Sequence, residues 1–237
     1  MAKLNDEWIV QPHGALTELE PGLLTVVGEI KMPLAKFPRR MTVVALENGS
    51  TALYSPIPLR EPDMARIETL GAPAYLIVPN PAHRLDIRPF QKRYPKAKIV
   101  TAPKAKSAVQ QAVKPVQTAA RLGAGVKLVA VCGTGERELA LVVDRGGSVS
   151  IVTNDIIGNV AKPDGIGGRL INLLLQFGPK PHVPRDVGGL LIADKGALAA
   201  QFRAWAEIDG LRRVIPSHGQ IIERPAATLR RLADRLS

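Results

Sequence analysis

Three apolar segments of this 237-residue chain each run into a short stretch that carries a histidine or a carboxylate. The segments are Leu76–Asp86, Val149–Asp155 and Arg213–Gly219. The first contains His83 and Asp86, the second ends at Asp155, and the third contains His218. Imidazole and carboxylate groups transfer protons and ligate metal ions, and proteins place such groups on loops at strand ends. The three strand ends could therefore converge on one site.

Each of these residues also has an ordinary structural interpretation. His83 could bond a backbone carbonyl, and Asp86 could cap the helix that follows it. Asp155 could bond the amides of a turn, and His218 could serve turn packing beside Gly219. The residue types alone leave both interpretations open.

Several further residues are weaker candidates. Asn80 and Arg84 lie in the same segment as His83, and His182 lies in a Pro-rich loop that could carry it over the site. Glu136 and Glu138 could act as acid, base or ligand, but solvated carboxylates at the start of a strand are the favoured interpretation. Cys132 directly follows an apolar run, which predicts a small buried strand residue rather than a catalytic thiol.

The composition is that of a globular protein. The hydrophobic content is 46%, and the length allows one large domain or two closely packed halves. No segment approaches the roughly 18 consecutive apolar residues of a membrane span, and the N-terminus lacks the apolar stretch of a signal peptide. Together with the single cysteine, this predicts a cytoplasmic protein with no membrane span.

The net charge of +11 is concentrated in residues 88–127, a stretch with ten basic residues and no acidic one. The basic residues are Arg88, Lys92, Arg93, Lys96, Lys98, Lys104, Lys106, Lys114, Arg121 and Lys127. Such a stretch attracts anions, which could be nucleic acid, acidic lipid headgroups or a phosphorylated small molecule. A solvated basic surface is the favoured interpretation, because only Phe90 and Tyr94 are available there for base stacking.

Short apolar runs separated by turns predict strands joined by hairpins, and Asn48-Gly49 is the strongest turn signal. Strands are predicted over 22–30, 40–46, 51–55, 76–80, 98–101, 126–131, 138–144 and 148–153. Helices are predicted over 61–70, 87–94, 165–177, 195–208 and 225–236. Residues 104–122 are interrupted by Pro115 and are predicted to lie on the surface, as two short helices or as a mobile excursion. Helices that alternate with strands indicate an α/β (α+β) fold.

The order of several segments resembles the metallo-β-lactamase fold. The segments are Arg40–Val44, Tyr54–Ile57, Val78–His83, Tyr94–Ala97, Thr153–Asn159 and Ser217–Gly219. The resemblance runs from about Gly22 to Leu236 and is closest to a family of unknown function with a Pro-Asn-x-x-His segment and a degenerate metal motif. It implies a single domain over 1–237, built as a four-layer αββα sandwich of two mixed sheets flanked by helices.

The resemblance also implies a reduced metal site. Active members of the superfamily carry His-x-His-x-Asp-His in the first segment, where this chain offers only His83 and Asp86. The Gly-His turn of the superfamily corresponds to residues 132–135, which contain no histidine. The resemblance therefore implies a site for one divalent ion, which would be zinc, iron or manganese, or no bound metal at all. The implied ligands are His83, Asp155 and His218, with Asp86 as a fourth ligand or a base.

We therefore expect a metallo-β-lactamase-like protein with an eroded metal site. It would act as a weak mononuclear metal-dependent hydrolase, with Asp86 and Asp155 as catalytic carboxylates, or bind a small anionic ligand. The alternative is a non-enzymatic protein that binds nucleic acid or another polyanion through residues 88–127.

Overall fold

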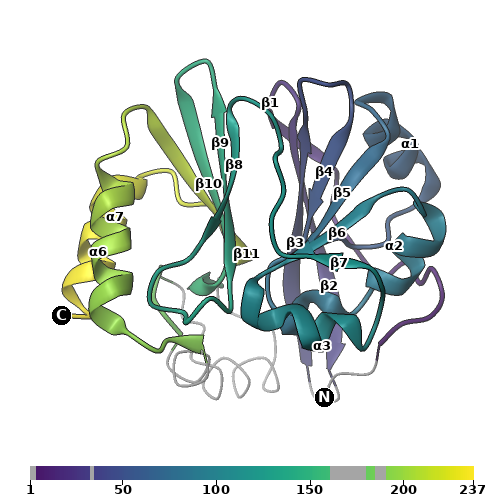
Figure 1. The fold of residues 1–237 in the computed structure, drawn as a ribbon. Coiled ribbons are helices and arrows are strands. Elements are labelled where there is room, and N and C mark those ends of the chain that lie inside the picture. Colours follow the sequence, from purple (N-terminus) through teal and green to yellow (C-terminus); the bar gives the residue numbers. More distant parts are fainter. Residues whose placement is uncertain (1–3, 33–34, 161–179, 185–190) are drawn as a thin grey trace.

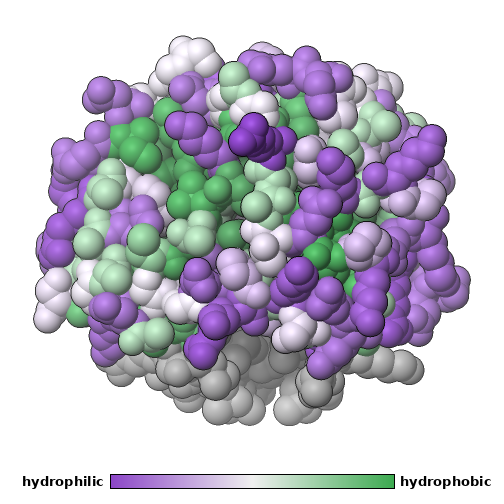
Figure 2. Space-filling model, viewed as in Figure 1, coloured by the Kyte–Doolittle hydropathy of each residue, from purple (hydrophilic) through white to green (hydrophobic). Residues whose placement is uncertain are grey.

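Two β-sheets pack face to face in the computed structural model, and helices cover the outer face of each sheet (Figure 1). The structure describes residues 4–32, 35–160, 180–184 and 191–237. Hydrophilic side chains cover most of the face in Figure 2, and apolar residues gather toward its middle. The predicted α+β sandwich of two mixed sheets is confirmed.

The first sheet has seven strands whose spatial order follows the chain. They are β1 (Thr17–Glu20), β2 (Leu23–Met32), β3 (Ala35–Ala45), β4 (Thr51–Tyr54), β5 (Pro73–Val78), β6 (Lys98–Thr101) and β7 (Val116–Gln117). Strands β1 to β4 pair antiparallel, and β4 to β7 pair parallel. The predicted hairpin joins β3 and β4, with Gly49 at φ +74°, a conformation that glycine adopts without strain.

The second sheet has four strands in the order β11-β10-β9-β8. They are β8 (Val126–Ala130), β9 (Leu139–Arg145), β10 (Ser148–Asn159) and β11 (Leu211–Gly219). Strands β10 and β11 run parallel, and their register breaks after Thr153 pairs with Pro216, because Gly158 is the residue that pairs with His218. The intervening residues of β10 bulge out of the ladder, and Asp155 lies in this bulge.

Helices pack on both outer faces. They are α1 (Glu61–Thr69), α2 (Ile87–Arg93), α3 (Lys106–Gln110), α6 (Lys195–Ala206) and α7 (Pro225–Asp234), with short 3₁₀ turns η1 (Pro81–Arg84) and η2 (Pro103–Ala105). One apolar cluster lies between the sheets, a second contains α1 and α2 residues, and a third contains α6 and α7 residues. Among the described residues, no helix is both long and apolar enough to cross a membrane.

Two expectations need correction. Residues 104–122 are built into the fold rather than held on the surface, because Val109 and Val116 are buried and β7 pairs with β6. Cys132 is exposed rather than buried, because β8 ends at Ala130 and the chain turns there. The helix predicted over 165–177 lies outside the described residues.

Candidate metal centre

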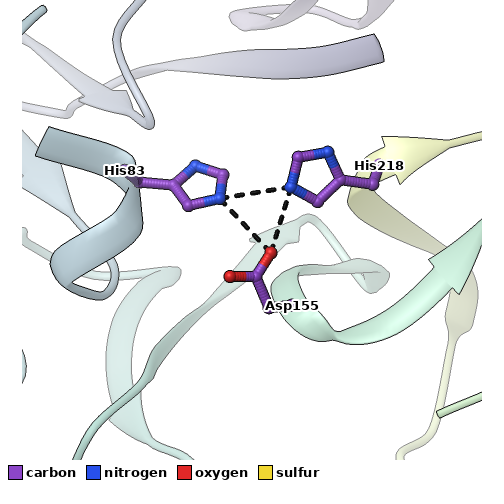
Figure 3. Close-up of side chains that lie close together, drawn as sticks. All are labelled: His83, Asp155 and His218. Carbon is purple, nitrogen blue, oxygen red and sulfur yellow. Dashed lines mark hydrogen bonds and ion pairs between the residues drawn. The ribbon is translucent and has the colours of Figure 1, made fainter. Parts of the chain in front are cut away.

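His83, Asp155 and His218 come together where η1, the β10 bulge and the end of β11 meet (Figure 3). The His83 Nε2 atom lies 3.3 Å from Asp155 Oδ1, and His218 Nε2 lies 3.0 Å from the same oxygen. The two Nε2 atoms are 3.2 Å apart. Three potential ligand atoms therefore face one point, although their residues are up to 135 positions apart in the chain.

Hydrogen bonds around the 3₁₀ turn η1 orient the His83 ring. The Asn80 carboxamide oxygen accepts the Ala82 N–H at 2.9 Å and so caps the 3₁₀ turn that carries His83. The Oγ of Ser55 lies 2.7 Å from His83 Nδ1. Ser55 itself has φ +55°, a conformation uncommon for residues other than glycine. These contacts leave His83 Nε2 directed at Asp155.

The orientation of His218 is set by backbone groups of both sheets. Its Nδ1 lies 2.7 Å from the Pro38 carbonyl oxygen, and since a carbonyl only accepts, Nδ1 carries the proton and donates it. The buried Arg40 guanidinium donates to the carbonyls of Pro216 and Gly219, on either side of His218. In the neutral ring, Nε2 therefore presents a lone pair to Asp155.

Asp155 is held by a buried carboxamide and lies beside a second carboxyl group. The Asn80 Nδ2 atom lies 2.7 Å from Asp155 Oδ2 and 3.1 Å from Glu138 Oε2. Glu138 is fully buried and also accepts the backbone N–H groups of Asp155 and Ile156. The interpretation of Glu138 as a solvated carboxylate is wrong, because Glu138 is fully buried. Sequence reasoning missed this burial, because the hydrogen-bond partners of Glu138 come from distant segments and no local sequence pattern identifies them.

Burial and mutual contact perturb these groups. Burial lowers the pKa of the His83 imidazole against the opposing effect of Asp155, which favours the neutral, metal-binding form. Burial alone would raise the pKa of the Asp155 carboxyl, but the facing imidazoles of His83 and His218 hold it well below its usual range. Burial and the Asp155 charge raise the pKa of Glu138 to about 8. Asp155 is therefore the charged carboxylate of the site at neutral pH.

The donor set suits one metal ion. A lone pair of His218 Nε2 against a carboxylate oxygen at 3.0 Å is unfavourable unless a proton or a cation lies between them. Tetrahedral ligands at zinc–nitrogen distances of about 2.0–2.1 Å are themselves about 3.3 Å apart. All three separations in the cluster, 3.0, 3.2 and 3.3 Å, are close to that value.

Comparison with known proteins gives a structural match alone. No protein-family model matches the chain, and no curated protein matches it. The FIM-1 metallo-β-lactamase from Pseudomonas aeruginosa, in its mono-zinc form, superposes with TM-score 0.63 at 12% identity, covering 96% of this chain and 98% of that one. The Pontibacter korlensis metallo-β-lactamase gives TM-score 0.62 at 12% identity, over 93% and 98% of the two chains. The chain has the metallo-β-lactamase fold. The match to the Hirschia baltica enzyme is similar, with TM-score 0.59, 13% identity and coverages of 94% and 97%.

Within this metallo-β-lactamase fold, Asp86 does not join the His83 cluster. Its buried carboxylate pairs with the buried Arg39 guanidinium and accepts from Asn5 Nδ2 at 2.7 Å. Asp86 lies at the N-terminus of α2, but its side chain makes no capping hydrogen bond. The ion pair instead links β3 to the segment that follows His83.

The two remaining candidates also lie outside the cluster of potential ligands. The Arg84 guanidinium donates to the Ala108 carbonyl and so ties η1 to α3. The backbone of His182 pairs with Gly158, and its Nδ1 lies 2.8 Å from the Lys180 carbonyl oxygen. Neither belongs to the group of potential ligands found among the described residues.

The basic stretch 88–127 is partly neutralised by acidic residues from other segments. Arg88 pairs with Asp6 at 2.7 Å, and Lys92 lies 3.4 Å from Glu7. Arg93 donates to both carboxylate oxygens of Glu61. The positive charge that the sequence concentrates in this stretch is therefore reduced at three of its ten basic residues.

Proposed function

We propose that the protein is a metal-dependent hydrolase with one metal ion held by His83, Asp155 and His218. The observation that carries this proposal is the convergence of three ligand atoms at mutual distances of 3.0, 3.2 and 3.3 Å. Three protein ligands leave a fourth position open, which is typical of catalytic rather than structural zinc sites. Zinc is the favoured ion, and iron and manganese are the alternatives. Support also comes from FIM-1, a protein of the same fold described in a mono-zinc form.

The residues around the ligands have separable tasks in this proposal. Ser55 and the Pro38 carbonyl orient the two imidazoles through Nδ1, so that both Nε2 atoms face the metal position. Asn80 holds Asp155 Oδ2, which leaves Oδ1 for the metal. A bound metal would polarise the scissile group and lower the pKa of a water in the fourth position. Asp86 is not assigned as the base, because Arg39 already pairs with it.

The substrate class rests on charge. The net charge of +11 favours a small anionic substrate or ligand, whether the site turns it over or only binds it. The fold does not specify the substrate, since unrelated chemistries share a fold.

Metal analysis tests the proposal directly. Protein purified without a chelator or a histidine tag should contain about one equivalent of zinc, iron or manganese. A His83→Ala and His218→Ala double variant should contain almost none, because two of the three ligand atoms are lost.

A matched control is the His182→Ala variant, which removes a histidine that lies outside the cluster. It should retain the wild-type metal content. Equal metal content in wild type and the double variant, or no metal in the wild type after incubation with zinc, would exclude the metal-dependent mechanism.

A further inference from the structure

We propose that Asn80 restricts this site to a single metal ion, because its carboxamide occupies the carboxylate oxygens that a second ion would need. The inference rests on the proposed function for the first ion. It concerns the side of Asp155 that faces away from His83 and His218.

The hydrogen bonds of Asn80 account for its whole side chain. Nδ2 donates to Asp155 Oδ2 at 2.7 Å and to Glu138 Oε2 at 3.1 Å. Oδ1 accepts the Ala82 N–H at 2.9 Å. Asn80 is 3% exposed and Glu138 is fully buried, so protein groups rather than solvent surround these atoms.

The reverse orientation of the carboxamide is unfavourable. It would place Oδ1 against two carboxyl oxygens and would direct the NH₂ group at the N–H of Ala82. The hydrogen-bond network therefore assigns Nδ2 to the side of Asp155 and Glu138. A primary amide nitrogen in this position carries hydrogens and offers no lone pair to a metal.

The neighbouring oxygens are also engaged. Glu138 Oε2 accepts the backbone N–H of Asp155 at 3.3 Å, and Oε1 accepts that of Ile156 at 3.3 Å. Asp155 thus has one oxygen, Oδ1, toward the two imidazoles and one, Oδ2, held by Asn80. The NH₂ group of Asn80 donates to Asp155 Oδ2 and Glu138 Oε2 and so occupies the position at which a second cation would bind.

An isosteric substitution isolates this effect. Asn80→Asp replaces the donor nitrogen with an oxygen and leaves three carboxyl groups, those of residues 80, 138 and 155, around one point. Carboxylate oxygens are preferred ligands of Mn²⁺. We expect the wild type to bind one equivalent of Mn²⁺ or Zn²⁺ in the presence of excess metal, and the Asn80→Asp variant to bind two equivalents of Mn²⁺.

The matched control is Asn159→Asp, which adds the same charge at a largely buried asparagine whose Nδ2 bonds the Gln220 carbonyl instead. It should bind one equivalent. Stoichiometry is measured by elemental analysis after equilibrium dialysis against MnCl₂ or ZnCl₂ alone, with folding checked by circular dichroism.

Two equivalents in the wild type would overturn the inference and leave the proposed function intact. One equivalent in a folded Asn80→Asp variant would also overturn it, since the amide would not be what excludes the second ion. No metal in the wild type would refute the proposed function itself. If Asn80→Asp does not fold, the wild-type stoichiometry in excess metal still decides between one ion and two.

Discussion

Replacing Arg40 by alanine should destabilise the fold and disorder the backbone around His218. Arg40 lies between the sheets and donates to Pro216 O at 3.2 Å, to Gly219 O at 2.7 Å and to Thr25 Oγ1 at 3.0 Å. Two of these bonds link β3 of the first sheet to β11 of the second. The substitution therefore removes a connection between the sheets at the position of a proposed ligand.

The size of the expected destabilisation follows from two opposing effects on the free energy of unfolding. Hydrogen bonds to a charged group contribute about 1.5–3 kcal/mol each, so the three bonds of Arg40 contribute on the order of 4–9 kcal/mol. Burial opposes this contribution, because it lowers the pKa of Arg40 to about 10. That lowering corresponds to a penalty on the charged form of roughly 3 kcal/mol. We expect a net loss of about 3 kcal/mol in the free energy of unfolding for Arg40→Ala.

The assay is urea denaturation of the protein in EDTA, so that metal binding does not add to the measured stability. Arg40→Lys keeps the charge but loses the forked geometry and should lie between wild type and Arg40→Ala. Arg230→Ala is the control, since its ion pair with Glu207 is exposed and should contribute less than about 1 kcal/mol. An Arg40→Ala variant as stable as Arg230→Ala would refute the assignment of Arg40 as the link between the sheets.

Four other outcomes are expected. Gly219→Ala should lose more than about 3 kcal/mol or fail to fold, because a Cβ there would lie 1.9 Å from the Asn159 carbonyl oxygen. Gly49 also has a positive φ, but a Cβ added there would meet no atom within 4 Å, so Gly49→Ala should lose only about 1 kcal/mol of unfolding free energy. Equal losses of stability for the two glycine variants in thermal melts would contradict the steric explanation. Ser55→Ala should weaken zinc affinity by about 10- to 100-fold in a competitive titration, with little change in the stability of the fold. Unchanged zinc affinity would show that Ser55 does not orient His83. If residues 88–127 bind a polyanion, affinity for DNA should fall steeply between about 50 and 200 mM salt in fluorescence anisotropy, and equally weak binding at both would reject that alternative.

Much of the secondary structure was predictable because its causes are local. The Asn48-Gly49 turn specifies the β3–β4 hairpin within a few residues. Asp194 caps α6 by accepting the Ala197 N–H at 2.9 Å, and Pro225 begins α7, as both residue types predict. The convergence of His83, Asp155 and His218 was also predictable, because each lies within or shortly after an apolar strand segment.

The partners of buried polar groups were not predictable from single segments. Asp86 and Asp155 are both carboxylates after apolar runs, yet Arg39 pairs with the first and two imidazoles face the second. Glu138 and Asn80 bond each other across 58 positions of sequence, and neither position is marked by a local pattern. Burial of a polar side chain is decided by which distant segment packs against it.

The sequence by itself determined most strands, the turns, most helices of the described chain and the candidate histidines, since these depend on side-chain periodicity and turn chemistry over a few residues. Tertiary structure alone decided which carboxylate faces the histidines and which is paired with Arg39. It also decided that the Asn80 carboxamide lies between two carboxyl groups. The physical reason is that hydrogen-bond partners and desolvation come from residues brought together only when the two sheets pack.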